Sequence, residues 1–326
     1  MLIKELTHKR RLYLALLWAV LTISVCYVSL FLSLAFLGTG DIADLISGDI
    51  YTFIPALMAI AFIIYFKTDI LSWDVFRNPG NKWLAFGVGY TFLVLSLTII
   101  TDAIFGLITI NQSYTPFEGD LSGLTTPDPL LNVILYLVIA GVLAIFSPGG
   151  FIRIVGEEFG WRGYLYPELL KLHPRLSLVI STFIVGGIWF TFHLPYFTVL
   201  APAPPDKIIF LLLGSFGVFF GANWFMLWTY LKTKSIWPAM MLHYSWNLAA
   251  PVFTGNLYDG SLGLLNISQN SLWLMNGEGL IGGFFHFSVG LVFLFLIFRN
   301  RNELYSNWKG SQKKEVKLPK KIRISS

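Results

Sequence analysis

Residues 130–163 read LLNVILYLVIAGVLAIFSPGGFIRIVGEEFGWRG, an apolar run that ends in two adjacent glutamates and an arginine. An apolar stretch of about 18 residues or more indicates a helix that spans a membrane. A charged side chain at membrane depth costs several kcal/mol, so it marks a candidate functional site. This one stretch therefore indicates both the class of fold and the region in which to look for chemistry.

The rest of the chain repeats the apolar pattern. Only 13% of the 326 residues are charged, whereas a soluble domain has about 25%. This composition excludes a soluble enzyme, a disordered chain and a secreted disulfide scaffold. We predict an all-α, polytopic integral membrane protein with about eight transmembrane helices. The eight apolar segments are 12–37, 51–66, 83–108, 130–152, 176–199, 208–231, 235–250 and 280–298.

The basic residues predict the orientation of these helices. If eight helices alternate, 22 of the 23 Lys and Arg residues lie on one side, and only Lys207 lies on the other. The positive-inside rule then predicts a multi-pass protein of the cell membrane with both termini on the cytoplasmic side. We predict one membrane domain over residues 1–299 and a basic cytoplasmic tail over 300–326. We expect the tail to be a solvated segment attracted to anionic lipids, with no nucleic-acid partner.

The two glutamates are expected to have different roles. On a helix, Glu158 and Arg162 are four residues apart on one face, whereas Glu157 is rotated by about 100°. Glu158 would then be held by the arginine, and Glu157 would be freer to accept a proton as a general base. The alternative is a pair of structural ion pairs that anchor the end of a helix.

Polar residues also interrupt two later apolar segments. His243 and Asn247 are four residues apart, so both side chains project from one helix face and could stabilise an oxyanion. His193 follows Trp189 by one turn, and the indole would fix the imidazole ring. Simple hydrogen bonding or packing between helices is the alternative for each. Asp102 is interpreted as an interfacial residue without a partner.

Together, these residues supply the groups needed for hydrolysis of a substrate. A base, an imidazole that positions water and an oxyanion stabiliser are all present. Glu157, His193 and His243 would equally suit a catalytic divalent metal such as zinc. His193 lies about 27 Å along its predicted helix from Arg175. It can therefore meet Glu157 only if the fourth segment bends at 147–150, or if the fifth helix tilts or begins later.

At these positions the sequence resembles the CPBP intramembrane proteases, which include type II CAAX prenyl endopeptidases and bacteriocin-processing or immunity proteins. The motifs EExxxR, FxxxH and HxxxN/B stand here as Glu157–Arg162, Trp189–His193 and His243–Asn247. Trp189 departs from the pattern because it replaces a phenylalanine. The resemblance covers about residues 130–250.

The resemblance implies an intramembrane endopeptidase that cuts a membrane-associated peptide or protein. Glu157 would activate water that His193 helps to position, and His243 and Asn247 would stabilise the oxyanion. Three further residues would support the site: Glu158, Arg162 and Trp189. Both metal-dependent and metal-free chemistry are compatible with these ligands. A catalytically silent scaffold or immunity protein, or less favourably a proton-coupled transporter, is the competing interpretation.

Overall fold

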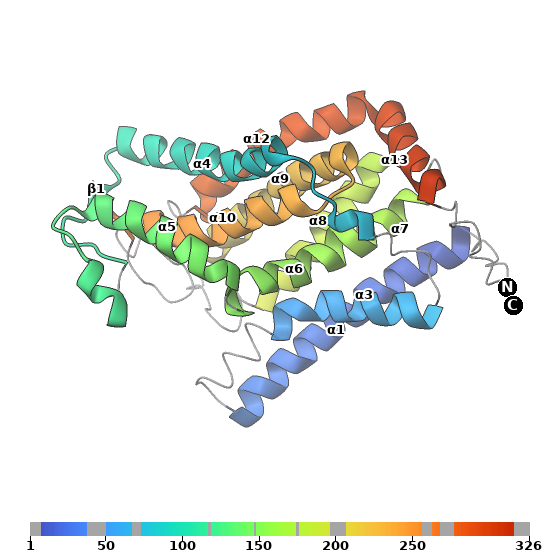
Figure 1. Ribbon diagram of the computed structural model, residues 1–326, viewed down its shortest axis with the longest axis horizontal. Coiled ribbons are helices and arrows are strands. Elements are labelled where there is room, and N and C mark those ends of the chain that lie inside the picture. Colours follow the sequence, from blue (N-terminus) through green and yellow to red (C-terminus); the bar gives the residue numbers. More distant parts are fainter. Residues whose placement is uncertain are drawn as a thin grey trace, which may run out of the picture.

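The computed structural model describes residues 8–37, 50–66, 73–116, 119–146, 148–173, 176–195, 207–255, 263–267 and 277–315. These residues form a bundle of helices (Figure 1). The described strands are one short antiparallel pair, β1 (Thr109–Ile110) with β2 (Leu265–Asn266). The predicted all-α membrane class is confirmed.

Every predicted apolar segment contains a helix. Five of them are long and apolar enough to cross a membrane by length and composition, and two shorter apolar helices cover residues 51–66 and 129–142. The count of eight spans stays a prediction. The helices are α1 (His8–Leu37), α3 (Tyr51–Phe66), α4 (Asn81–Ile104), α5 (Pro129–Phe146), α8 (Leu178–Pro195), α9 (Ile208–Thr233), α10 (Trp237–Thr254) and α12 (Leu280–Arg299).

The fourth segment is interrupted where its sequence is poorest in helix formers. After α5, a π-helical turn covers Pro148–Ile152, and the short helix α6 (Arg153–Glu158) follows. A second π-helical stretch, Phe159–Leu165, leads into α7 (Tyr166–Leu170). Proline lacks a backbone donor and glycine weakens a helix, which favours a break in regular winding here. Figure 1 shows the chain changing direction between α5 and α6.

Glycines allow α3 to pack directly on the segment that carries the glutamates. A Cβ atom on Gly156 would lie 2.8 Å from the Phe53 Cα, and one on Gly160 would lie 2.4 Å from the Pro55 Cβ. Four-residue spacing of small residues lets helix backbones approach closely in membranes. Because α3 occupies this face, the two glutamates between the glycines are directed to other parts of the bundle.

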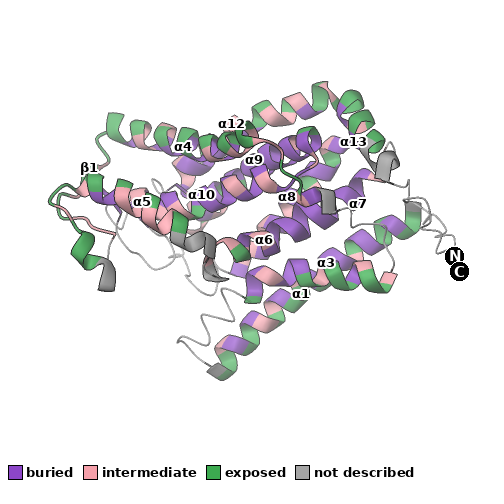
Figure 2. Ribbon diagram, viewed as in Figure 1, coloured by how far each residue is buried: buried purple, intermediate pink, exposed green. Residues whose placement is uncertain are grey.

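The centre of the bundle is α9, which packs closely against α12. A Cβ on Gly217 would lie 2.1 Å from the Gly283 carbonyl oxygen, and one on Gly221 would lie 2.1 Å from that of His286. Figure 2 shows that buried residues are concentrated on α9 and on the segment from α6 to α7, whereas α1, α4 and α12 each expose a face. The best-buried helices are therefore the ones that surround the glutamates.

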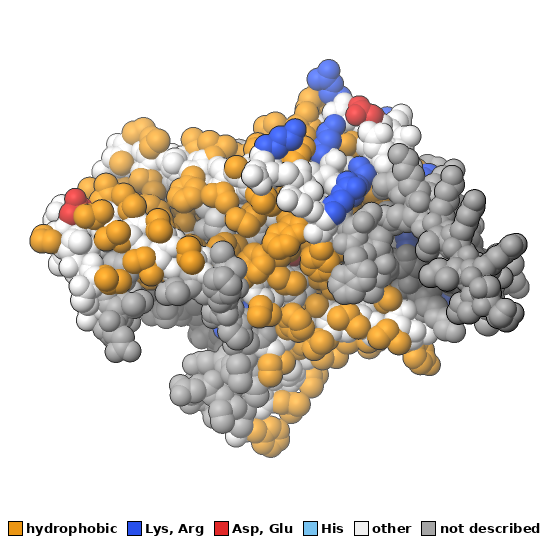
Figure 3. Space-filling view, in the orientation of Figure 1, with side chains coloured by type: hydrophobic (Ala, Val, Ile, Leu, Met, Phe, Trp, Pro, Cys, Tyr) orange, Lys and Arg blue, Asp and Glu red, His pale blue; other side chains and the backbone are white. Residues whose placement is uncertain are grey.

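The outward faces of the bundle are apolar. Large side chains such as Phe31, Ile64 and Phe284 are between 62% and 71% exposed. On the face drawn in Figure 3, hydrophobic side chains cover much of the described surface, and the Lys and Arg side chains are gathered toward one end. Such a surface is unfavourable in water and suits a lipid environment. It agrees with a multi-pass membrane protein.

The basic tail begins with a packed helix. Helix α13 (Arg301–Glu315) follows α12 and packs against α9. Leu304 and Trp308 are buried, and Glu303 lies 3.7 Å from Lys232. The first half of the predicted solvated tail is thus part of the fold, whereas residues 316–326 lie outside the described residues.

A short 3₁₀ helix, Trp73–Phe76, is fixed to the turn between α9 and α10. The Ile236 amide donates to the Val75 carbonyl (2.9 Å), and the Trp237 indole donates to the Phe76 carbonyl (2.6 Å). In this turn Lys234 adopts a left-handed conformation (φ 60°), and burial, with nearby Arg77 and Lys232, lowers its pKa to about 8. Phe76 stacks on Phe159, directly after the two glutamates.

Asp102, which the sequence places near the end of its span, is fully buried within the described structure, and its interfacial position stays a prediction. His286, in contrast, has a polar neighbour on another helix. Its Nδ1 lies 3.3 Å from the Tyr90 hydroxyl, and its ring packs on Trp246 at 4.3 Å. Sequence spacing along one helix cannot show such contacts between helices.

Substituting Gly160 by Leu should destabilise the bundle by about 1–3 kcal/mol or more, because the new side chain overlaps Pro55. Thermal unfolding of the purified protein in detergent would measure the change. Gly89→Ala is the matched control, since a Cβ there meets nothing within 4 Å. A Gly160→Leu protein as stable as this control would contradict the close packing of α3.

Candidate active site

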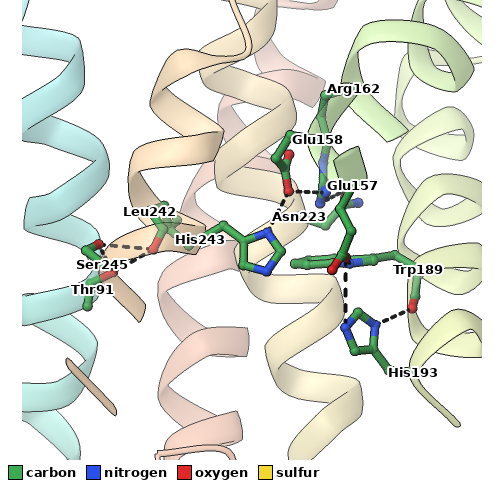
Figure 4. Close-up of polar contacts among 10 residues, drawn as sticks. All are labelled: Thr91, Glu157, Glu158, Arg162, Trp189, His193, Asn223, Leu242, His243 and Ser245. Atoms are coloured by element: carbon green, nitrogen blue, oxygen red, sulfur yellow. Dashed lines mark hydrogen bonds and ion pairs between the residues drawn. The ribbon is translucent and has the colours of Figure 1, made fainter. Parts of the chain in front are cut away.

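The polar residues of three helical segments meet in the interior of the bundle (Figure 4). Glu157 and Glu158 end α6, and Arg162 lies in the following π-helical turn. Trp189 and His193 come from α8, and His243 comes from α10. The interrupted fourth segment and the start of α8 at Leu178 thus bring Glu157 and His193 together.

Glu157 faces α8. Its Oε2 accepts a hydrogen bond from the Trp189 indole nitrogen at 3.0 Å and lies 3.9 Å from the His193 Nε2. The other ring nitrogen of His193, Nδ1, lies 3.0 Å from the Trp189 carbonyl oxygen. A carbonyl can only accept, so Nδ1 carries a proton. In the neutral imidazole, Nε2 therefore presents a lone pair toward the carboxylate.

Glu158 faces away from Glu157 and makes its contacts to Arg162 and His243 through one oxygen. Its Oε1 accepts from the Arg162 Nη1 at 2.9 Å and lies 3.0 Å from the His243 Nδ1. Both members of the Glu158–Arg162 ion pair are fully buried. Removing one partner of such a pair leaves an uncompensated charge in the interior, which is strongly destabilising. The geometry therefore makes Glu158 a structural anchor for Arg162 and His243.

Asn223 on α9 extends this network and was not identified from the sequence. Its Oδ1 accepts from the Arg162 Nη2 at 3.1 Å, and its Nδ2 donates to the Thr182 carbonyl at 2.8 Å. The signal that could have found it is an amide within a long apolar helix, because polar side chains in such segments usually have partners. Asn223 connects the buried ion pair to α8, two turns before Trp189.

Trp189 contacts both Glu157 and the arginine of the buried ion pair. The Arg162 guanidinium lies 4.2 Å from the centroid of its ring, a favourable cation–π position. The indole also contacts His243 at 5.7 Å and the edge of Phe219 at 4.8 Å between ring centroids. The His193 ring lies 4.3 Å from Phe219. The aromatic wall expected beside His193 is present, and it includes a residue of α9.

Two tyrosines from the N-terminal helices hold the end of α8. The Tyr27 hydroxyl donates to the Thr191 carbonyl, and the Tyr51 hydroxyl donates to the Phe192 carbonyl. The last carbonyls of a helix lack partners within the helix, so such donors stabilise its end. Helices α1 and α3 thereby fix the backbone directly before His193.

Asn247 does not join the cluster. It lies one turn after His243 on α10, but it is exposed, and the described residues give it no hydrogen bond to the other site residues. The two residues lie one helix turn apart, but only His243 is buried, so the structure does not place both side chains in one space. The oxyanion role of Asn247 stays a prediction.

The donor types would suit zinc, but their arrangement does not hold it. Zinc sites need three or four ligands within about 2.0–2.3 Å of one point. Among the described residues, no group of three His, Cys, Asp or Glu side chains is placed to hold a metal ion. The Nε2 of His193 faces Glu157, whereas the Nδ1 of His243 is occupied by Glu158. We therefore derive no chemical step through a metal.

The family comparison covers the segment that builds this site. Residues 126–249 match the family model described as type II CAAX prenyl endopeptidase, Rce1-like. This segment is therefore similar to the CAAX-type proteases. It contains α5 to α9 and most of α10, whereas α1, α3, α4 and α12 lie outside the match. No curated protein matches the chain at a significant level.

Replacing Asn223 by Leu should lower the stability of the protein by about 1–3 kcal/mol, because Arg162 loses a buried acceptor. The midpoint of thermal unfolding in detergent would show the loss. Ser215→Ala on the same helix is the control, since its buried hydroxyl has no hydrogen-bond partner among the described residues. Equal stability of the two variants would contradict a structural role for the Arg162–Asn223 bond.

Proposed function

We propose that the chain is an intramembrane endopeptidase that hydrolyses a peptide bond of a membrane-associated protein or peptide. The observation that carries the proposal is the facing pair, with the Glu157 Oε2 and the His193 Nε2 3.9 Å apart. Both atoms are acceptors when His193 is neutral with its proton on Nδ1. The pair suits a molecule that donates two hydrogen bonds, such as water.

A single water can connect these two acceptors. With hydrogen bonds of about 2.8 Å to each atom, the two bonds meet at about 90°. As the water oxygen attacks the substrate carbonyl carbon, Glu157 accepts a proton from it, and His193 keeps the oxygen in position. The tetrahedral intermediate then collapses, the C–N bond breaks, and Glu157 returns the proton to the leaving nitrogen.

The negative charge that develops on the substrate carbonyl oxygen needs hydrogen-bond donors. His243 donates from Nδ1 to Glu158, and a second proton on Nε2 would let it donate to the oxyanion. Asn247, one turn further along α10, offers its amide from an exposed position to a substrate that arrives from outside the bundle. These two residues are our proposed oxyanion stabilisers, and Glu158 and Arg162 hold His243 in place.

The site suggests where a substrate would lie. Glu157 is buried among apolar helices, so the cleaved segment must reach membrane depth or be carried there by a lipid anchor. A prenylated CAAX tail, which the family description names, satisfies this requirement. A leader peptide or a linker of a membrane protein satisfies it as well. We also propose that both termini face the cytoplasm of the cell membrane and that anionic lipids contact the basic tail.

The central test is Glu157→Gln, which keeps the side-chain shape but removes the base. In membranes that contain this variant, mass spectrometry should show a peptide that the wild-type protein cuts and the variant leaves intact, with turnover reduced at least about 100-fold. Glu303→Gln on α13 is the matched control, because it makes the same chemical change away from the site.

Cleavage that continues in a folded Glu157→Gln protein would contradict the proposed base. A biological effect that persists without any cleavage would instead indicate a silent scaffold or immunity protein. Treating the wild-type protein with a chelator in the same assay distinguishes metal-dependent from metal-free hydrolysis. Unchanged turnover supports activation by glutamate and histidine alone, whereas loss that added zinc restores would overturn the metal-free step.

A further inference from the structure

We propose that Trp189 is a positioning residue, whose indole N–H sets the orientation of the Glu157 carboxylate toward His193. The inference rests on the proposed function, because it concerns the group that activates water. It goes beyond the aromatic wall expected beside His193, since such a wall needs only an aromatic surface. Here the ring nitrogen of Trp189 donates a hydrogen bond to Glu157.

The Trp189 indole bonds to the carboxylate oxygen of Glu157 that faces His193. The Trp189 Nε1 donates at 3.0 Å to the Glu157 Oε2, and this is the same oxygen that lies 3.9 Å from the His193 Nε2. Glu157 is only 4% exposed. Within the described part of the chain, no other side chain donates a hydrogen bond to this carboxylate. Its direction toward the water position therefore depends on the indole.

Trp189 holds both members of the facing pair by different atoms. Its side-chain nitrogen orients Glu157, and its backbone carbonyl accepts from the Nδ1 of His193. The indole is itself fixed, because the Arg162 guanidinium lies over one part of the ring and Phe219 packs against it. The buried ion pair thus supports the water-activating pair through this one side chain.

The residue type makes the inference specific to this chain. The resemblance noted from sequence has phenylalanine at this position, and phenylalanine has no hydrogen-bond donor. Substitution of Trp189 by Phe keeps the backbone bond to His193 and removes the bond to Glu157. The two contributions of the residue can therefore be separated by experiment.

Two variants test the N–H itself. The first is Trp189→Phe. The second replaces Trp189 by benzothienylalanine, in which sulfur takes the place of the N–H group at nearly constant ring size. The control is Trp237→Phe, which loses an indole bond to the Phe76 carbonyl away from the carboxylates. Turnover is measured with the proteins in liposomes, on a quenched fluorescent peptide that ends in a farnesylated CAAX sequence.

Both Trp189 variants should lower kcat by about 10-fold to 100-fold and leave KM within about twofold, because a charge-assisted bond is lost after the substrate has bound. The Trp237→Phe control should keep wild-type kcat. Wild-type kcat in the benzothienylalanine protein, or a change confined to KM, would overturn the inference. Wild-type cleavage by Glu157→Gln would instead overturn the proposed function.

A second measurement does not depend on cleavage. In ¹⁵N-tryptophan protein, the indole signal that disappears in Trp189→Phe identifies the N–H of residue 189. This signal should shift in Glu157→Gln, because the acceptor loses its charge, and it should stay in place in Glu303→Gln. An unchanged signal in Glu157→Gln would show that the indole does not donate to Glu157.

Discussion

The buried ion pair between Glu158 and Arg162 is the constraint on which the site depends. Burying two charges among apolar helices is costly, and further hydrogen bonds to the pair offset part of that cost. Here His243 contacts the Glu158 Oε1 and Asn223 accepts from the Arg162 Nη2, and these residues come from α10 and α9. The need to satisfy one ion pair therefore fixes four helical segments relative to one another, because Asn223 also bonds to α8.

The same constraint separates the roles of two adjacent carboxylates. Glu158 is occupied by Arg162 and His243, whereas Glu157, one residue earlier, is directed to α8 by the turn of the helix. Gly156 and Gly160 let α3 close the opposite face, so neither glutamate can turn away from the interior. The arrangement leaves one carboxylate as a structural group and the other beside an imidazole.

The sequence could predict the helices, the Glu158–Arg162 pair and the residues of the cluster, because apolar length and four-residue spacing act along one helix. It could not predict Asn223, or the tyrosines that hold the end of α8, since these contacts depend on how helices rotate against one another. Asn247 shows that correct spacing along a helix does not ensure that a residue joins the site. Its spacing from His243 is correct for one face, yet the packing of α10 leaves it exposed.

A high-resolution experimental structure of the protein in a lipid nanodisc would test the water-activating pair most directly. If Glu157 and His193 hold the water, its density should lie within about 3 Å of both the Glu157 Oε2 and the His193 Nε2. A separation of these two atoms too large for one or two waters would contradict it. A metal ion held at about 2.0–2.2 Å by Glu157, His193 and His243 would contradict it equally.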